Sequence, residues 1–224
     1  NAILSTADRL YTNIRDEEFL SKYLSSYLKN IIDLAERQKW QAKTNLFLSR
    51  NLKKQPFEAR YSIKPTLLWD VINKGIDVAI PTARKYDVLS QNISINRDSD
   101  RNLTINIDED AFIAVFYNLF TNAIKYHDPK NKDGFYLRTS YWIGDNNLII
   151  TIEDKGMGIK EKDKSKIFEK GYRSESAIRS NASGYGVGLT FVKQIVKDFG
   201  GDISITSLMN PTVFRIDIPL IKIQ

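Results

Sequence analysis

The clearest hydrophobic pattern in the chain is helical and lies in its second half. Between Asp108 and His127 the apolar residues return at helical spacing, and Asp108 stands in the position of an N-cap. A second amphipathic helix is predicted over residues 190–199, and Gly200 and Gly201 supply the usual signal for its end. The apolar faces consist of Phe112, Val115, Phe116, Leu119, Ala123 and Ile124 in the first helix and of Leu189, Val192, Ile195, Val196 and Phe199 in the second.

Two strand pairs are predicted around these helices. Residues 135–143 and 148–153 are rich in strand-forming residues and pair across a turn at 144–147. A closing hairpin joins 203–207 to 213–219 through Met209, Asn210 and Pro211. The second half of the chain is therefore expected to combine strands with helices.

The first 55 residues have a different pattern. Residues 2–14 form a short helical stretch, and a longer helix begins at 16–18 with an N-cap and two carboxylates at its positive end. Leu20, Leu24, Tyr27, Ile31 and Leu34 are spaced four, three, four and three, which predicts a seam for packing against other helices.

This seam meets polar residues past Leu34, namely Gln38, Gln41 and Asn45. Packing there is expected to weaken or to move to Ala35, Ala42 and Leu46. The alternative to a dimer seam is a plain pair of core helices within one monomer.

The composition agrees with a globular enzyme fragment. The 224 residues allow one or two domains, and 42% hydrophobic residues suffice for a core. The chain has no cysteine, which excludes disulfides, a thiolate nucleophile and a Cys-based zinc site. No apolar run approaches membrane-spanning length, and Asn1 is not a start methionine, so a piece of a longer, cytoplasmic chain is expected.

The net charge of +6 is unevenly distributed. Residues 1–60 hold 11 Lys and Arg against 7 Asp and Glu, whereas residues 61–224 hold 22 against 20. The basic side chains of the first part are scattered at helical intervals, which indicates a solvated helix face rather than a nucleic-acid interface. They include Lys29, Arg37, Lys39, Lys43, Arg50, Lys53 and Lys54. A basic surface also suits an acidic protein partner.

The first candidate for chemistry is a polar stripe on the helix that begins after Asp108. Asn118, Asn122 and Lys125 stand at i, i+4 and i+7, so they share one side of an otherwise apolar helix. Magnesium prefers oxygen ligands such as an amide carbonyl and phosphates, and a lysine neutralises phosphate charge. The alternative is that the stripe faces bulk water.

The second candidate follows the strand at 148–153. Asp154 at the strand end is able to accept a hydrogen bond from an exocyclic amine such as that of adenine. Gly156 and Gly158 permit positive φ and the close approach of a base. Without the other patches this segment reads as an ordinary turn.

The third candidate is the glycine cluster at 184–189, which opens directly onto the helix at 190–199. Free backbone N–H groups at a helix start attract phosphate, and glycines let the backbone come close. The polar segment 173–183 between the two glycine patches is expected to act as a mobile lid over a triphosphate.

In this order and spacing, these segments resemble the ATP-binding catalytic domain of sensor histidine kinases, in the superfamily shared with DNA gyrase, MutL and the heat-shock chaperone. Residues 117–126 resemble its N box and 154–158 its first glycine box. Residues 167–174 resemble its F box, which favours a histidine kinase over the other members, and 184–189 its second glycine box.

The resemblance covers roughly residues 61–220 and implies the fold class. This is a two-layer α/β sandwich, a mixed sheet covered on one face by helices, assigned to residues 59–224. Residues 1–58 resemble the helical hairpin through which such kinases dimerise as a four-helix bundle.

The family resemblance also implies roles at the phosphates of ATP. Asn122 holds Mg²⁺, Asn118 and Lys125 contact the phosphates, and Arg173 reaches the phosphate that is transferred. Asn118, Lys125 and Arg173 are therefore the expected catalytic residues.

At the adenine, the resemblance implies that Tyr126 packs on the ring, that Asp154 reads its amino group, and that Phe168 seats the lid. The remaining residues expected at the nucleotide are Gly156, Gly158, Ile159, Gly184, Tyr185, Gly186, Val187, Gly188 and Leu189. Lys170 and Gly171 depart from the Arg-Phe pair that is common in the F box.

The phosphate acceptor is expected to lie outside this chain. In the family the phosphorylated histidine stands a few residues before a segment like 2–4, and the only histidine here is His127, which we expect to be a helix-end residue. The fragment should therefore bind ATP without labelling itself. Its expected partners are a second copy, through the N-terminal helices, and a response-regulator receiver domain, with no nucleic acid and no membrane contact.

Two other functions suit the same residues. A serine kinase of the same fold, such as an anti-sigma regulator, would need no acceptor histidine. A non-catalytic module would use ATP as a conformational clamp or not at all.

Overall fold

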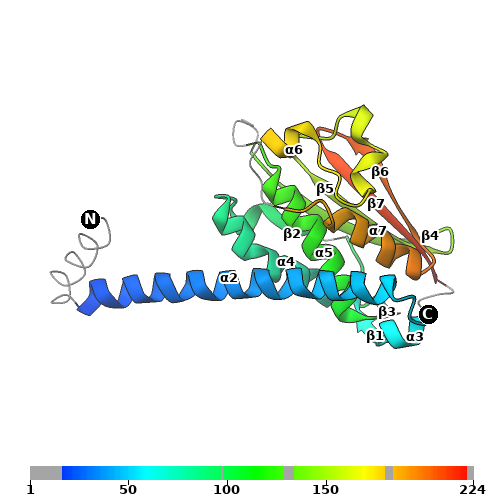
Figure 1. Ribbon diagram of the computed structural model, residues 1–224, viewed down its shortest axis with the longest axis horizontal. Helices are drawn as coiled ribbons and strands as arrows, with labels where there is room; N and C mark the ends of the chain where they lie inside the picture. Colours follow the sequence, from blue (N-terminus) through cyan, green and yellow to red (C-terminus); the bar gives the residue numbers. More distant parts are fainter. Residues whose placement is uncertain (1–16, 97, 129–133, 180–183, 221–224) are drawn as a thin grey trace.

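The computed structural model describes residues 17–96, 98–128, 134–179 and 184–220, and its centre is a five-stranded mixed sheet (Figure 1). The strands are β2 (Ile93–Ile95), β4 (Leu137–Gly144), β5 (Asn147–Asp154), β6 (Asp202–Leu208) and β7 (Thr212–Pro219). Their order is β2-β4-β5-β7-β6, with β2 parallel to β4 and the other pairs antiparallel. A separate antiparallel ribbon joins β1 (Lys64–Leu67) to β3 (Thr104–Ile107).

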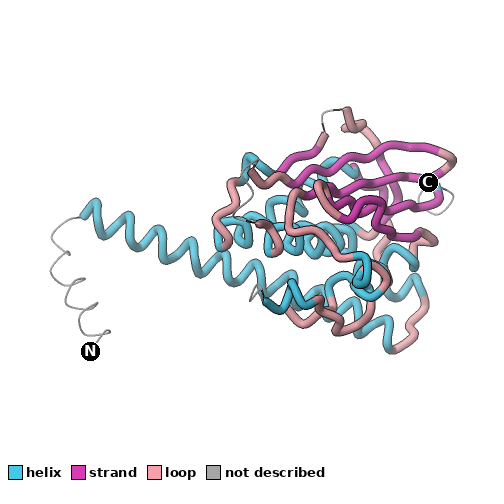
Figure 2. The backbone as a smooth tube through the Cα atoms, turned by 90° about the horizontal axis from the view of Figure 1, so that it is seen from above, coloured by secondary structure: helices cyan, strands magenta, loops and turns pink. Residues whose placement is uncertain are grey.

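Helices cover one face of this sheet, as predicted. Along β7, Phe214, Ile216 and Ile218 are buried and alternate with half-buried residues, a pattern typical of a sheet with one face on the core. The covering helices are α4 (Leu68–Lys85), α5 (Glu109–Lys125) and α7 (Gly188–Asp198). Figure 2 shows the helical layer against the strands. The shorter elements are α3 (Phe57–Arg60), α6 (Glu175–Arg179) and the 3₁₀ turns η1 (Ser90–Asn92), η2 (Glu161–Asp163) and η3 (Lys166–Phe168).

The predicted helix boundaries are confirmed within two residues. Asp108 caps α5, because its Oδ1 accepts a hydrogen bond from the Ala111 amide at 2.8 Å. Its Oδ2 accepts from the Ser62 amide at 2.7 Å and so also fixes the segment that leads out of the N-terminal helix. Helix α7 begins at Gly188, and Gly200 follows its end with a φ of +75°.

Both predicted hairpins are present, and the first is tighter than expected. Gly144 pairs with Asn147, so the turn between β4 and β5 consists of Asp145 and Asn146 alone. Both residues have positive φ, of +49° and +62°, as the favoured two-residue hairpin turn requires. The hairpin of β6 and β7 turns at residues 209–211, as predicted.

Helix α2 (Glu17–Leu52) is one continuous helix whose second half lies across α4, α5 and α7 (Figures 1 and 2). Its first half extends away from the rest of the molecule. None of the helices within the described ranges combines the length and apolar content that a membrane crossing needs. The predicted helix at 2–14 and the cap at Asp16 lie outside the described residues.

The face by which α2 packs on this chain differs from the predicted one. Along the described part of the seam, Leu24, Tyr27 and Ile31 are half exposed or more. Beyond Leu34, Ala35, Ala42 and Leu46 are exposed as well, so none of them packs on this chain. Among the α2 side chains that the structure describes, the buried ones are Asp33, Trp40, Thr44 and Phe47. They lie on another side of the helix. This side meets α5 and α7, because Trp40 packs on Tyr117, Thr44 is hydrogen-bonded to Asn118 and Phe47 packs on Phe191.

The segment after α2 is tied to α7 through a shared carboxylate. Asp198 Oδ2 accepts a hydrogen bond from the Tyr61 hydroxyl at 2.5 Å and pairs with the Arg60 guanidinium. Gln194 Nε2 donates to Asp198 Oδ1 at 3.1 Å. These contacts fix where α2 leaves the helical layer and hence how its second half lies on it.

Candidate functional site

A cavity of about 450 Å³ lies between α5, the N-terminus of α7 and the loop that follows β5, and α2 forms part of its wall. Asn118, Asn122 and Lys125 all line this cavity. The alternative that the polar stripe of α5 faces bulk water is therefore wrong.

Asn118 is held in place by its neighbours. Its Nδ2 donates to the Ala114 carbonyl at 2.7 Å and to the Thr44 hydroxyl of α2 at 3.1 Å. Its Oδ1 lies against Gly188, where an added Cβ would approach it to 2.7 Å. Asn118 thus joins α2, α5 and the start of α7, and Gly188 provides the space for it.

Asn122 differs from Asn118, although both residues line the cavity. Its half-buried side chain makes no hydrogen bond to any of the residues that the structure describes. Its amide is therefore available to a ligand without breaking an existing contact.

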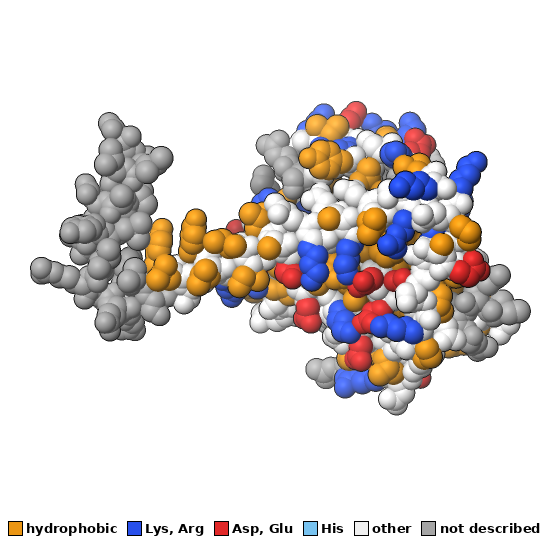
Figure 3. All heavy atoms as spheres, turned by 60° about the horizontal axis from the view of Figure 1, so that its bottom comes forward, with side chains coloured by type: hydrophobic (Ala, Val, Ile, Leu, Met, Phe, Trp, Pro, Cys, Tyr) orange, Lys and Arg blue, Asp and Glu red, His pale blue; other side chains and the backbone are white. Residues whose placement is uncertain are grey.

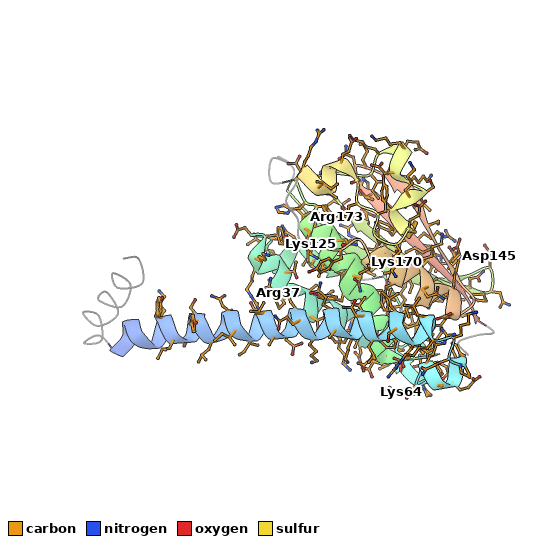
Figure 4. All side chains as sticks on the ribbon, viewed as in Figure 1. Arg37, Lys64, Lys125, Asp145, Lys170 and Arg173 are labelled. Carbon is orange, nitrogen blue, oxygen red and sulfur yellow. The ribbon has the colours of Figure 1, made fainter. Side chains whose placement is uncertain are left out.

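Four cations line the same cavity from four different elements. Lys125 is on α5, Lys85 at the end of α4, Arg37 on α2 and Arg173 in the loop before α6. Arg37, Lys125 and Arg173 follow one another from α2 to this loop in Figure 4. Burial, reinforced by Lys85, Arg37 and Arg173, lowers the pKa of Lys125 to about 8. This end of the cavity is suited to an anion.

Asp154 supplies the opposite character. Its side chain is only 7% exposed, and burial raises its pKa to about 7, against the lowering effect of the Gly156 amide. Oδ1 accepts a hydrogen bond from that amide at 3.0 Å, whereas Oδ2 accepts none among the described residues. The wall of the cavity therefore offers a donor one carboxylate oxygen of a largely buried residue that has no hydrogen bond within the described residues.

The glycine cluster at 184–189 forms another wall, as predicted. Gly186 has a φ of +68°, and an added Cβ would come within 2.6 Å of the Tyr172 carbonyl oxygen. Helix α7 begins directly after it at Gly188, so the positive end of this helix faces the cavity.

Gly156 is required for a steric reason. An added Cβ would lie 2.7 Å from Asp154 Oδ1 and 2.8 Å from the Tyr126 carbonyl oxygen. We expect Gly156→Ala to lower the free energy of unfolding by about 2–3 kcal/mol, because the backbone of Tyr126 must move. Chemical denaturation measures this change.

The control for that measurement is Gly171→Ala, whose new Cβ would meet no atom within 4 Å but whose φ is +80°. It carries only the conformational cost, roughly 1 kcal/mol. A Gly156→Ala protein as stable as the control would contradict the steric account.

Two residues predicted at the nucleotide do not line the cavity, Phe168 and Gly156. The Phe168 ring meets the Phe214 ring edge-on at 6.4 Å, and its carbonyl accepts a hydrogen bond from the Thr190 hydroxyl at 3.0 Å. Phe168 therefore joins η3 to α7 and β7. The other predicted site residues line the cavity: Asn118, Asn122, Lys125, Tyr126, Asp154, Gly158, Ile159, Arg173, Gly184, Tyr185, Gly186, Val187, Gly188 and Leu189.

The predicted lid is partly described. Arg173 Nη2 donates to the Ala177 carbonyl at 3.0 Å, and this contact spans the start of α6. Residues 180–183 of the lid lie outside the described residues. His127 does not line the cavity and, as expected, ends the helix, with Nδ1 2.9 Å from the Ile124 carbonyl oxygen.

The α2 wall of the cavity was not predicted. Arg37, Gln38, Gln41 and Asn45 line the cavity, although the basic residues of this helix were interpreted as a solvated face. That interpretation is wrong for Arg37. The available signal was the spacing of Trp40, Thr44 and Phe47 by four and three, which marks a second buried side of α2.

A family model described as "Histidine kinase-, DNA gyrase B-, and HSP90-like ATPase" matches residues 107–222, more than half of the chain. The chain belongs to this ATPase family. The matched segment includes α5, both glycine segments and the F-box segment, and so most of the cavity wall.

Relatives of this ATPase domain include a sensor protein and a sensor histidine kinase. It is 38% identical over 122 residues to the sensor protein RprX of Bacteroides fragilis, covering 54% of this chain and 23% of RprX. It is 35% identical over 106 residues to the sensor histidine kinase WalK of Bacillus subtilis, covering 46% of this chain and 17% of WalK. The chain thus spans about a quarter or less of these two relatives, and it is a catalytic ATPase domain of the two-component sensor histidine kinase type.

Solved structures support the fold. The catalytic domain of the histidine kinase ThkA superposes with a TM-score of 0.57 at 22% identity, covering 71% of this chain and 96% of that one. The Acinetobacter baumannii histidine kinase AdeS superposes with a TM-score of 0.56 at 20% identity, covering 97% of this chain and 94% of AdeS. Full-length ShkA in complex with AMPPNP superposes with a TM-score of 0.59 at 18% identity, covering 90% of this chain and 45% of ShkA.

Proposed function

We propose that this ATPase domain binds Mg-ATP in the cavity and transfers the γ-phosphoryl group to a histidine nitrogen, from which a receiver aspartate takes it. Adenine donates its amino hydrogen to Asp154 Oδ2 and packs on Tyr126. The triphosphate runs toward Asn118, Lys125 and Arg173, with the backbone at Gly184, Gly186 and Gly188 close to it.

One observation carries this proposal. The same cavity has on one wall the buried carboxylate of Asp154, which accepts a single hydrogen bond within the described residues, and on another wall a group of Lys and Arg side chains. A nucleobase amine suits the first wall and a polyphosphate suits the second. The structure of ShkA with AMPPNP, an ATP analogue, adds support from a protein of similar fold.

Magnesium fits this site through the nucleotide. The described residues contain no group of three His, Asp or Glu side chains that would hold a metal by themselves. The free amide of Asn122 offers one oxygen ligand, and phosphate oxygens supply others. Bound magnesium would neutralise phosphate charge, and the chain positions the nucleotide for in-line transfer.

The acceptor histidine comes from outside the cavity-forming residues. His127 is the only histidine in the sequence and does not line the cavity. In the transfer, the bond between the γ-phosphorus and the bridging oxygen breaks, ADP leaves, and a phosphorus–nitrogen bond forms. The domain supplies position and charge neutralisation rather than a nucleophile.

The test combines binding with product chemistry. Calorimetric titration of the chain with ATP and Mg²⁺ should show one site. Radiolabel from γ-labelled ATP should then pass to a longer chain that carries the preceding segment, as an acid-labile, alkali-stable product. An acid-stable product would favour a same-fold serine kinase, and absent nucleotide binding would overturn the proposal.

We also propose that a second copy packs on the first half of α2. Its exposed apolar side chains gather along the protruding helix in Figure 3. They are Tyr23, Leu24, Tyr27, Leu28, Ile31, Ile32 and Leu34. Exposed apolar surface of this extent is typical of an interface, and the solution mass of the chain decides whether it forms a dimer.

The titration of Lys125 predicts a pH dependence of ATP binding. Its pKa of about 8 means that it is charged at neutral pH and loses its proton as the pH rises through 8. The charged form binds phosphate, so ATP affinity is expected to fall about tenfold from about pH 7 to about pH 9.5. Calorimetry across this range measures it.

Lys125→Arg is the matched variant, because a guanidinium keeps its charge over the whole range. Its ATP affinity should change much less with pH. An equal fall in both proteins would show that Lys125 does not contact the phosphates.

A further inference from the structure

Contacts of the neighbouring α2 residues hold Arg37 in place at the wall of the cavity. On one side of it, Asp33 Oδ2 accepts a hydrogen bond from Arg84 Nε at 2.8 Å, which ties α2 to α4. On the other, Trp40 is buried against Tyr117, with ring centroids 6.4 Å apart. The Tyr117 hydroxyl donates to the Arg37 carbonyl at 3.4 Å. Arg37 is therefore fixed at the cavity by contacts before and after it.

Its guanidinium is only partly engaged. Arg37 Nε donates to the Asp33 carbonyl at 3.3 Å, and the two terminal nitrogens make no hydrogen bond among the described residues. Lys85 lines the same cavity and forms no ion pair with any described carboxylate. Neither cation is thus paired with a carboxylate of the described residues, although the Lys85 ammonium lies over the Tyr86 ring, 5.5 Å from its centroid.

The two carboxylates that line the cavity form no ion pair with Arg37 or Lys85 within the described residues and are hydrogen-bonded to other groups. Asp154 Oδ1 accepts from the Gly156 amide, and Asp163 Oδ1 accepts from the Tyr172 hydroxyl at 2.8 Å. Bringing Arg37 and Lys85 together with Lys125 is unfavourable unless an anion joins them.

We propose that Arg37 and Lys85 are further ligands of the triphosphate, so that bound ATP bridges α2 to the ATPase domain. This rests on the proposed function, and it extends that function beyond the residues of the matched family segment, 107–222. The terminal phosphate carries the highest charge of the nucleotide and is the group that these added cations suit best. ATP should therefore hold α2 in place more strongly than ADP does.

Affinities for ATP and ADP, measured on the whole chain by calorimetry with Mg²⁺, test the proposal. Arg37→Ala should bind ATP about tenfold more weakly and ADP less than about threefold more weakly. Lys85→Ala should act in the same direction. Lys29→Ala, which removes one charge from the exposed half of α2, is the control and should match the wild type.

Equal ATP affinity of wild type, Arg37→Ala and Lys85→Ala would overturn this proposal alone. Failure of the wild type to bind either nucleotide would overturn the proposed function as well, so the two failures are distinguishable.

A second measurement needs no variant. Hydrogen exchange of the α2 amides at 34–45 in the wild type should be slower with ATP than with ADP, because the coupling of two sites is reciprocal. Arg37→Ala should remove this difference. Exchange that is the same with both nucleotides would contradict the bridge.

Discussion

Replacing Asn122 with alanine is expected to weaken magnesium-dependent ATP binding by roughly 100-fold or more while leaving the stability of the domain unchanged. The reason is the difference between two neighbouring asparagines. Asn122 lines the cavity and makes no hydrogen bond within the described residues, whereas Asn118 is bonded to Ala114 and Thr44. Loss of the Asn122 amide therefore removes a ligand and no structural contact. Titration with ATP, with and without Mg²⁺, measures the effect.

The matched variant is Asn122→Asp, which keeps an oxygen in the same place. It should retain a larger part of the magnesium dependence than the alanine variant. Thermal unfolding of all three proteins should agree closely. An alanine variant that keeps wild-type affinity for Mg-ATP would remove Asn122 from the metal site.

Asp154→Asn is expected to reverse the base preference of the cavity and to stabilise the nucleotide-free domain. Asp154 Oδ2 is free to accept from the adenine amine, and an asparagine amide nitrogen in that place would donate instead. In this variant the asparagine amide and the adenine amine would face each other as two donors, which should weaken ATP binding about 100-fold. ITP carries a carbonyl in place of that amine, so it should bind to the variant better than it binds to the wild type. Competition between ATP and ITP measures the exchange.

The stability change follows from the raised pKa of Asp154. Its carboxyl ionises near 3.8 in the unfolded chain and near 7 in the folded one, so the folded state binds more protons between these values and stability falls as the pH rises through them. Above pH 7 the buried charge costs on the order of 4 kcal/mol. An asparagine avoids the cost of the buried charge but buries an amide without a partner. The free energy of unfolding of the variant is therefore expected to exceed that of the wild type by about 1–2 kcal/mol at pH 8.

That gain should disappear near pH 5, where Asp154 is already protonated in the folded state. Chemical denaturation at the two pH values is the measurement. A variant that is equally stabilised at both, or that still prefers ATP to ITP, would contradict a buried, adenine-reading carboxylate.

The sequence was sufficient to predict the parts of the fold that depend on local pattern. The apolar repeat from Phe112 to Ile124 and the cap at Asp108 predict α5, and the glycine pair at 200–201 predicts the end of α7. The spacing of Asn118, Asn122 and Lys125 predicts that they share one side of the helix, which the cavity confirms. These features depend on residues within a few turns of one another.

The α2 wall could not be predicted in the same way. Leu24, Tyr27 and Ile31 make the stronger local seam, so the sequence favours that side of the helix for packing. Whether Arg37 faces water or a cavity depends on Trp40 and Phe47 packing over α5 and α7, contacts between residues about 70–150 positions apart along the chain. Periodicity alone cannot say which of two apolar sides of a helix meets its own chain.

The crystal structure of the chain with Mg²⁺ and a non-hydrolysable ATP analogue tests the central claim most directly. The nucleotide should occupy the cavity, with the adenine amine within hydrogen-bond distance of Asp154 and the phosphates among Lys125, Arg173 and the amide of Asn122. A cavity that stays empty at millimolar analogue, or a nucleotide bound with its base away from Asp154, would contradict the account.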